Sequence, residues 1–115
     1  MSIKTKNYRF EEFECKCGCG LNLATIELLH VCELVRALNG GVSLPVSSGT
    51  RCATYNAKVG GAPYSQHVKG TAADLPVKNP QYIYDRLDKL FLYSHGIGDY
   101  SNFIHVDIRQ KKARW

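Results

Sequence analysis

The chain has 115 residues, of which 44% are hydrophobic and 22% charged, and this composition is typical of a globular protein that folds as one domain. The formal net charge of +5 favours anionic partners, such as nucleic acid or an anionic cell-wall polymer. No apolar run approaches the roughly 20 residues of a transmembrane helix, and the N-terminus lacks the apolar core and cleavage site of a signal peptide. We therefore expect a single domain over residues 1–115, synthesised in the cytoplasm and without a membrane partner.

In chain order, the first predicted element is a short docking segment at residues 8–14, which packs through Phe10 and Phe13. Apolar residues then recur at helical spacing over residues 24–39, and a pair of glycines ends this helix. We expect the helix to belong to the core, and its His30 to be structural rather than a metal ligand.

The middle of the chain predicts a strand, a short helix and a second strand. Residues 42–48 alternate between apolar and polar side chains, and Pro45 suggests an edge position. A short helix is expected over residues 53–58. Gly70 disfavours a helix beyond it, because an interior glycine costs about 1 kcal/mol. We therefore expect a loop that runs into a strand starting near residue 71 and carrying Asp74.

A last helix and a last strand complete the predicted fold. Asn79 followed by Pro80 is a helix-start signal, and Gly96 is expected to end that helix. Residues 103–109 alternate strictly and predict a strand, whereas the basic residues 109–115 are expected to form a solvated terminus. This order of elements predicts an α+β domain in which helices cover a small, mostly antiparallel sheet around a metal site.

Five cysteines occupy positions 15, 17, 19, 32 and 52. An odd number of cysteines without a secretion signal argues against a complete disulfide framework. The cysteines of residues 15–19 are dense enough to bind a soft metal, but their spacing is not the C-x2-C pattern of zinc ribbons. We expect reduced cysteines in a tight turn that serves the N-terminal fold, with a second metal or a disulfide as the alternative.

Three side chains have the chemistry of zinc ligands. His67 and Asp74 are seven positions apart on either side of a glycine, and His105 belongs to the last predicted strand. Neutral imidazole and carboxylate suit zinc, and three protein ligands plus water is the catalytic form of such a site. Because alternate residues of a strand share a face, Asp107 and Arg109 lie on the same side as His105. We interpret the chain as a scaffold for one catalytic zinc held by His67, Asp74 and His105.

Four segments in a fixed order carry a family pattern. They read SSGTR at 47–51, YNAKVGGA at 55–62, SQHVKGTAAD at 65–74 and HVDIR at 105–109. Together they resemble the zinc D-Ala-D-Ala carboxypeptidase family of peptidoglycan peptidases, and most closely its compact single-domain branch, which is common in bacteriophages and bacteria. The opening FECKCGCG and the closing ARW also resemble that branch, so the resemblance covers nearly the whole chain.

The resemblance implies a role for each residue that matches the family pattern. It assigns zinc binding to His67, Asp74 and His105, and substrate orientation to Arg51. Many family members have an acidic base three residues before the last histidine ligand, and here that position is Asn102.

An amide cannot accept a proton at neutral pH, so the base has to lie elsewhere. We predict that Asp107, on the strand face of His105, is the catalytic base. The alternatives are that Asp107 orients His105 or that Asp99 is the base.

The resemblance implies cleavage of peptidoglycan stem peptides, as a D,D-carboxypeptidase or as an endopeptidase. The alternative from another class is a zinc-stapled wall-binding module that has lost catalysis, because the acid at position 102 is absent. Ser65 and Cys52 lack a nucleophile motif, which argues against a serine or cysteine hydrolase. Basic residues do not alternate with aromatic ones, so we expect no nucleic-acid partner. We expect a monomer, and a phage lytic enzyme that reaches the wall after release by a separate phage protein.

Overall fold

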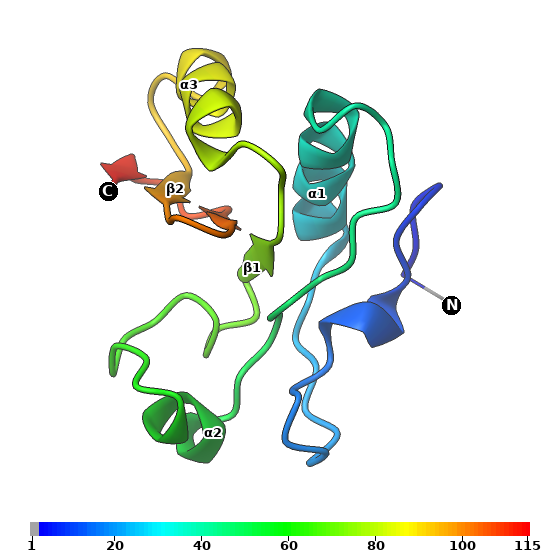
Figure 1. Ribbon diagram of the computed structural model, residues 1–115. Coiled ribbons are helices and arrows are strands. Elements are labelled where there is room, and N and C mark those ends of the chain that lie inside the picture. Colours follow the sequence, from blue (N-terminus) through cyan, green and yellow to red (C-terminus); the bar gives the residue numbers. More distant parts are fainter. Residues whose placement is uncertain (1–2) are drawn as a thin grey trace.

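The computed structural model describes residues 3–115, and its centre is a sheet of four short strands (Figure 1). The strands are β1 (Ala72–Leu75), β2 (Gly96–Asp99), β3 (Ile104–Asp107) and β4 (Ala113–Arg114). They lie in the order β1-β3-β2-β4. Strand β3 is antiparallel to both of its neighbours, and β4 is parallel to β2. The sheet is therefore mixed but mostly antiparallel, as predicted.

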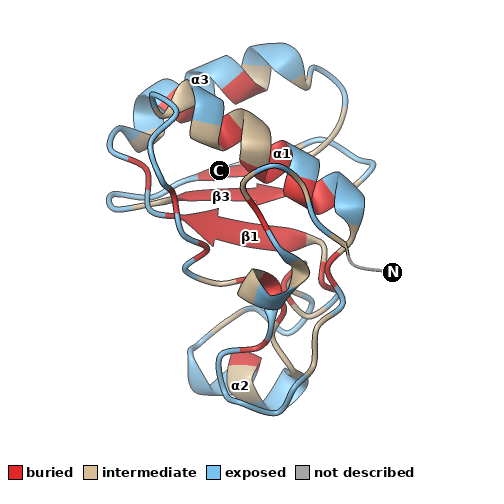
Figure 2. Cartoon of the chain, turned by 90° about the vertical axis from the view of Figure 1, so that its right-hand side faces the viewer, coloured by how far each residue is buried: buried red, intermediate tan, exposed pale blue. Residues whose placement is uncertain are grey.

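Two helices cover one face of this sheet. Helix α1 (Ile26–Leu38) packs on β1 and β3, and helix α3 (Pro80–Leu90) packs on β2 and β3 (Figure 2). Between them lies the apolar core, to which the helices contribute Leu28, Leu29, Val35, Ile83 and Leu87 and the strands Ala73, Leu75, Ile97, Ile104 and Val106. The fold is thus the α+β architecture that the sequence predicts.

Two smaller elements lie outside this two-layer core. The helix α2 (Ala53–Lys58) is placed well away from α1 and α3 (Figure 1). The short 3-10 helix η1 (Phe10–Phe13) buries Phe13 completely and Phe10 in part, which confirms the predicted docking segment. No described helix has the length and the apolar character needed to cross a bilayer.

The strand predicted at residues 42–48 is wrong. Leu44 and Val46 are buried as the alternation requires, but the segment forms only an isolated bridge between Ser48 and Asp74. Its two backbone hydrogen bonds join Ser47 and Ser48 to Asp74. Pro45 has no N–H to donate, so pairing with β1 is confined to one end of the segment. The pattern predicted burial correctly but not a strand.

The end of the chain also departs from prediction. Helix α3 ends at Leu90, and Gly96 opens strand β2 instead of ending the helix. The tail is exposed at residues 110–112 and at Trp115, but residues 113–114 form β4 and are half-buried. The side chain of Arg114 donates hydrogen bonds to Asp88 and to the carbonyl oxygens of Phe91, Ser94 and His95. The density of positive charge predicts a solvated tail, whereas the Arg114 side chain forms part-buried hydrogen bonds to these backbone carbonyls.

The strand register determines which residues share the uncovered face of the sheet. His105 lies between Asp74 of β1 and Gly98 of β2, and Asp107 lies opposite Gly96. Both His105 and Asp107 are buried, so the polar row on β3 is not a solvated face. The two glycines of β2 leave room beside these polar side chains.

Candidate metal centre

His67, Asp74 and His105 converge on the uncovered face of the sheet. The Asp74 Oδ1 atom lies 3.2 Å from His67 Nε2 and 3.1 Å from His105 Nδ1. All three side chains are buried, and their ligand atoms lie within 4.8 Å of one another. The structure thus brings together the three side chains that the sequence predicted as metal ligands. His30 is exposed and belongs to neither of the two clusters of potential metal ligands in residues 3–115.

The backbone holds these side chains in three ways. Strand pairing sets Asp74 directly opposite His105. The loop before β1 carries His67, whose backbone N–H donates to Ser65 Oγ at 3.1 Å. Gly70 has a φ of +76°, and a Cβ there would lie 2.4 Å from Leu23 Cβ. Only glycine allows the loop to turn at this point and enter β1.

The hydrogen bonds of the two histidines fix which ring nitrogen faces Asp74. His67 Nδ1 lies 2.7 Å from the carbonyl oxygen of Gly49, which can only accept, so Nδ1 carries the proton. His105 Nε2 lies 2.8 Å from Asp107 Oδ2, so here Nε2 carries the proton. The opposite nitrogens therefore have free lone pairs that face Asp74 Oδ1.

His67 Nε2, His105 Nδ1 and Asp74 Oδ1 are therefore three acceptor atoms that meet with no proton between them. A bound cation would interact favourably with all three lone pairs. Two imidazole nitrogens and one carboxylate oxygen are also a donor set of catalytic zinc sites. Hydrogen bonds to the remote nitrogens orient metal-binding histidines and fix their tautomers in such sites. The residues present therefore fit a zinc ion.

The charges around this cluster favour a cation as well. Burial opposes ionisation of Asp74, but the adjacent His105 and His67 rings outweigh it and lower the pKa of Asp74 to about 2. Burial lowers the pKa of His105, yet the carboxylates of Asp107 and Asp74 on either side of the ring outweigh it and raise that pKa. The carboxylate is therefore charged at neutral pH and ready to bind a metal.

Asp107 is fully buried and belongs to a dense set of hydrogen bonds. Its Oδ1 accepts from the backbone N–H of Gly96 at 3.0 Å and from Arg109 Nε at 2.8 Å. Its Oδ2 accepts from Arg109 Nη2 at 2.7 Å and from His105. Burial opposes ionisation of Asp107, but hydrogen bonds from His105 and Arg109 hold the pKa of this carboxyl well below its usual range. This arrangement favours orientation of His105 over the general-base role that the sequence suggested.

The cluster opens onto a cavity of about 540 Å³. Its walls include four aromatic side chains, together with the glycine-rich loop after α2; the aromatic residues are Tyr64, Tyr100, Phe103 and Trp115. Asp74 is the one carboxylate among the described residues that line the cavity. Asp99 pairs with Ile104 and so points to the opposite face from His105. Asn102 is exposed and does not line the cavity.

Arg51 lines the same cavity and contacts Asp74. Its Nη2 lies 3.3 Å from Asp74 Oδ2, its Nη1 donates to Asn56 Oδ1 at 3.2 Å, and its Nε donates to Ser48 Oγ at 3.1 Å. A guanidinium has five N–H groups, so two remain for a ligand in the cavity. Asn56 is in turn buried and bonded to Ala62, which fixes the arginine in one orientation.

Trp115 and Asn56 are site residues that the sequence reasoning missed. The Trp115 ring centroid lies 4.9 Å from that of His105, and its Nε1 donates to Tyr100 Oη at 2.8 Å. The closing ARW is part of the family resemblance, but nothing in its pattern places Trp115 near a histidine on β3. The contact between Asn56 and Arg51 also has no signal in the sequence, because no motif pairs these two residues.

A family model described as Peptidase M15 matches residues 6–107, which is most of the chain. The chain belongs to the peptidase M15 family. This confirms the resemblance to the zinc D-Ala-D-Ala carboxypeptidases, and the family is zinc-dependent, in agreement with the donor set of His67, Asp74 and His105. A search of curated proteins gave no match.

Proposed function

We propose that this M15 domain is a zinc peptidase that cleaves peptidoglycan stem peptides, as a D,D-carboxypeptidase or an endopeptidase. The observation that carries the proposal is the convergence of three acceptor atoms on the wall of a cavity that also exposes Arg51. His67, Asp74 and His105 would hold the single catalytic ion. Bound zinc would supply a Lewis acid that polarises the scissile carbonyl and makes water more acidic.

Arg51 is the residue that would orient the substrate. Its two free N–H groups lie beside Asp74 and can bind a carboxylate through the planar fork. In a carboxypeptidase that group is the terminal D-alanine carboxylate, and in an endopeptidase it is the D-glutamate carboxylate. The aromatic walls of the cavity exclude water from the peptide and provide apolar contact area.

This chain differs from the family pattern in the residue for proton transfer, because Asn102 stands where many members have an acid. Asp74 Oδ2 faces Arg51, and Asp107 is occupied by His105 and Arg109. The described cavity therefore contributes no carboxylate dedicated to moving a proton. This supports a second candidate function, a wall-binding module with weak or absent catalysis.

The site of action follows from the proposed substrate. A stem-peptide peptidase works at the bacterial cell wall, and we propose a phage lytic enzyme that acts after release by a separate phage protein. The net charge of +5 favours approach to an anionic wall polymer. We propose that the monomer is the working form.

The test is digestion of purified, cross-linked peptidoglycan by the zinc-loaded protein, with mass spectrometry of the released muropeptides. An endopeptidase converts cross-linked dimers to monomers, and a carboxypeptidase removes terminal D-alanine. The His67→Ala variant should do neither. Binding to peptidoglycan without cleavage would support the wall-binding module, and neither binding nor cleavage would overturn both proposals.

A further inference from the structure

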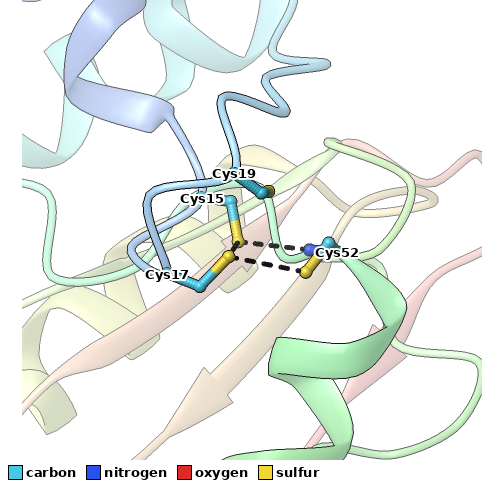
Figure 3. A group of neighbouring side chains, drawn as sticks. All are labelled: Cys15, Cys17, Cys19 and Cys52. Atoms are coloured by element: carbon cyan, nitrogen blue, oxygen red, sulfur yellow. Dashed lines mark hydrogen bonds between the residues drawn. The ribbon is translucent and has the colours of Figure 1, made fainter.

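Four cysteine thiols form a second cluster of potential metal ligands (Figure 3). Cys15, Cys17 and Cys19 come from one loop, and Cys52 lies 35 residues after Cys17. All four sulfur atoms lie within 4.8 Å of one another. Only the first three are close together in the sequence, and nothing in the spacing predicts that Cys52 completes the set.

The two shortest contacts of the Cys17 sulfur with its neighbours Cys15 and Cys52 have the length found in a metal site and not in a disulfide. The Sγ atom of Cys17 lies 3.5 Å from that of Cys15 and 3.7 Å from that of Cys52. A disulfide requires about 2.05 Å, and all these cysteines are free. Zinc–sulfur bonds of about 2.3 Å in a tetrahedron separate neighbouring sulfurs by about 3.8 Å. The observed spacing therefore leaves room for one ion at the centre.

The backbone around the cluster offers hydrogen bonds to sulfur. The N–H of Cys52 donates to Cys15 Sγ at 3.3 Å, and the N–H of Tyr55 donates to Cys52 Sγ at 3.3 Å. Such donors stabilise sulfur as an anion, the form in which it binds metal. Two glycines at positive φ, Gly18 and Gly20, turn the loop so that it can present three thiols.

Further backbone contacts hold the two cysteine-bearing segments together beside the thiols. The N–H of Thr50 donates to the carbonyl of Phe13 at 2.8 Å, and the N–H of Leu23 donates to Thr50 Oγ1 at 3.0 Å. A Cβ at Gly49 would lie 2.6 Å from the Phe13 carbonyl oxygen, so this approach requires glycine. The thiols therefore meet at a junction that the fold itself creates.

We propose that Cys15, Cys17, Cys19 and Cys52 bind one zinc ion in a closed, tetrahedral all-sulfur site, separate from the His67 centre. Four protein ligands leave no position for a substrate, so this ion is structural. It joins the N-terminal loop to the segment that supplies Arg51, the residue before Cys52, and the Gly49 carbonyl that orients His67. An all-sulfur site also suits iron, and metal analysis separates the two ions.

The test is the metal content of the purified full-length chain, measured by mass spectrometry after purification under reducing conditions. The wild type should contain about two zinc ions per chain, and the Cys17→Ser/Cys19→Ser double variant about one. The His67→Ala/His105→Ala double variant should also contain about one, and X-ray absorption of that ion should show only sulfur neighbours at about 2.3 Å. Cys32→Ala, which removes a buried cysteine outside the cluster, is the matched control and should keep both ions.

Cobalt substitution gives an independent readout when the cysteine variant folds poorly. The histidine double variant, which keeps all four thiols, should show thiolate-to-cobalt charge-transfer absorption on addition of Co²⁺, and the wild type should show it too. Absence of this band in both proteins would overturn the proposal. So would a nitrogen or oxygen shell around the remaining zinc, iron in place of zinc, or a disulfide among these cysteines in the protein as purified.

Discussion

Asp107 and Asp74 lie on opposite sides of the His105 ring. Asp107 Oδ2 is 2.8 Å from Nε2, and Asp74 Oδ1 is 3.1 Å from Nδ1. The imidazole therefore separates Asp107 from the point where the three proposed zinc ligands meet. A carboxylate in this position can hold the ring and its tautomer, but it does not reach the cavity.

The first prediction is that Asp107→Asn weakens zinc binding. The amide keeps the shape of the side chain but loses the charge that holds the His105 proton, and loss of such a partner costs about 10–100-fold in metal affinity. Chelator competition measures the affinity of the histidine centre, and Asp85→Asn, on the exposed side of α3, is the control. If the variant binds zinc normally but loses about 10²–10⁴-fold in kcat, Asp107 is the general base after all.

The second prediction uses the glycines of β2 as a contrasting pair. A Cβ at Gly96 would lie 2.1 Å from Asp107 Oδ2, whereas a Cβ at Gly98 would lie 2.6 Å from Trp115 Nε1. Both substitutions to alanine should cost about 1–3 kcal/mol in the free energy of unfolding, the usual range for overpacking. Only Gly96→Ala should also reduce zinc affinity, because it displaces Asp107. Equal zinc affinities in the two variants would contradict the positioning role.

The third prediction concerns Arg51. Arg51→Lys removes the planar fork and the contacts to Ser48 and Asn56. Hydrogen bonds to a charged group contribute about 1.5–3 kcal/mol, so kcat/KM should fall by about 10–100-fold, mainly through KM. The measurement compares a stem peptide ending in a free carboxylate with the same peptide amidated at that end. If the protein is a carboxypeptidase, the Arg51→Lys variant should no longer prefer the peptide with the free carboxylate. An equal fall in kcat/KM on both peptides would show that Arg51 only supports Asp74.

The fourth prediction concerns the stability of the C-terminal tail. Arg114 donates to Asp88 and to the carbonyl oxygens of Phe91, Ser94, His95 and Ala113, and only 12% of its side chain is exposed. Lysine cannot satisfy these acceptors together, so Arg114→Lys should lower the free energy of unfolding by about 2 kcal/mol. Urea denaturation measures the change, and Arg86→Lys, which is exposed on α3, should alter it by less than about 0.5 kcal/mol. An unchanged free energy of unfolding in Arg114→Lys would mean that water replaces these contacts.

The fifth prediction is a pH dependence centred on Glu33. Its carboxylate accepts from the Asn7 N–H at 2.6 Å and from Thr5 Oγ1 at 2.7 Å, which fastens the N-terminal segment to α1. Burial raises the pKa of Glu33, but hydrogen bonds from the Asn7 side chain, from Thr5 and from the Asn7 backbone outweigh it and lower the pKa. The carboxylate therefore contributes stability above the unfolded-state pKa of about 4.3, and this contribution is lost as the pH falls below that value.

Hydrogen exchange of the Asn7 amide at pH 7 and at low pH measures this effect. The wild type should lose protection as Glu33 is protonated, and Glu33→Gln should have low protection at both pH values. Glu11→Gln, on the exposed side of η1, is the control and should behave as the wild type. Protection in the wild type that does not change with pH would contradict the role of Glu33.

The sequence predicted those parts of the molecule whose signal is local or carried by a motif. Apolar spacing gave α1, and the Asn79–Pro80 start gave α3, where Asn79 Oδ1 accepts from the Tyr82 N–H at 3.1 Å. The spacing of His67, Asp74 and His105 indicated ligands that the fold brings together. What it could not give depends on contacts between distant segments. The β2 sequence GIGD has little strand propensity, and β4 forms only because β2 is there to pair with it.

The contacts of individual side chains could not be predicted from the sequence, because they also depend on distant segments. The pattern on β3 correctly placed Asp107 on the face of His105, but it could not tell which ring nitrogen Asp107 would meet. The contact of Cys52 with the N-terminal cysteines likewise follows from the approach of Gly49 to Phe13, and no spacing rule includes that approach. Strand periodicity gives the face of a residue, whereas its role depends on the partners that tertiary structure supplies.

The central claim is that His67, Asp74 and His105 hold a zinc ion, and anomalous diffraction at the zinc absorption edge tests it most directly. A crystal of the zinc-loaded chain should give an anomalous peak at about 2.0–2.2 Å from His67 Nε2, an Asp74 carboxylate oxygen and His105 Nδ1, with the remaining position open to the cavity. An anomalous map with no peak at this position, or with the His105 ring more than about 6 Å from the other two ligands in the zinc-loaded crystal, would contradict the account.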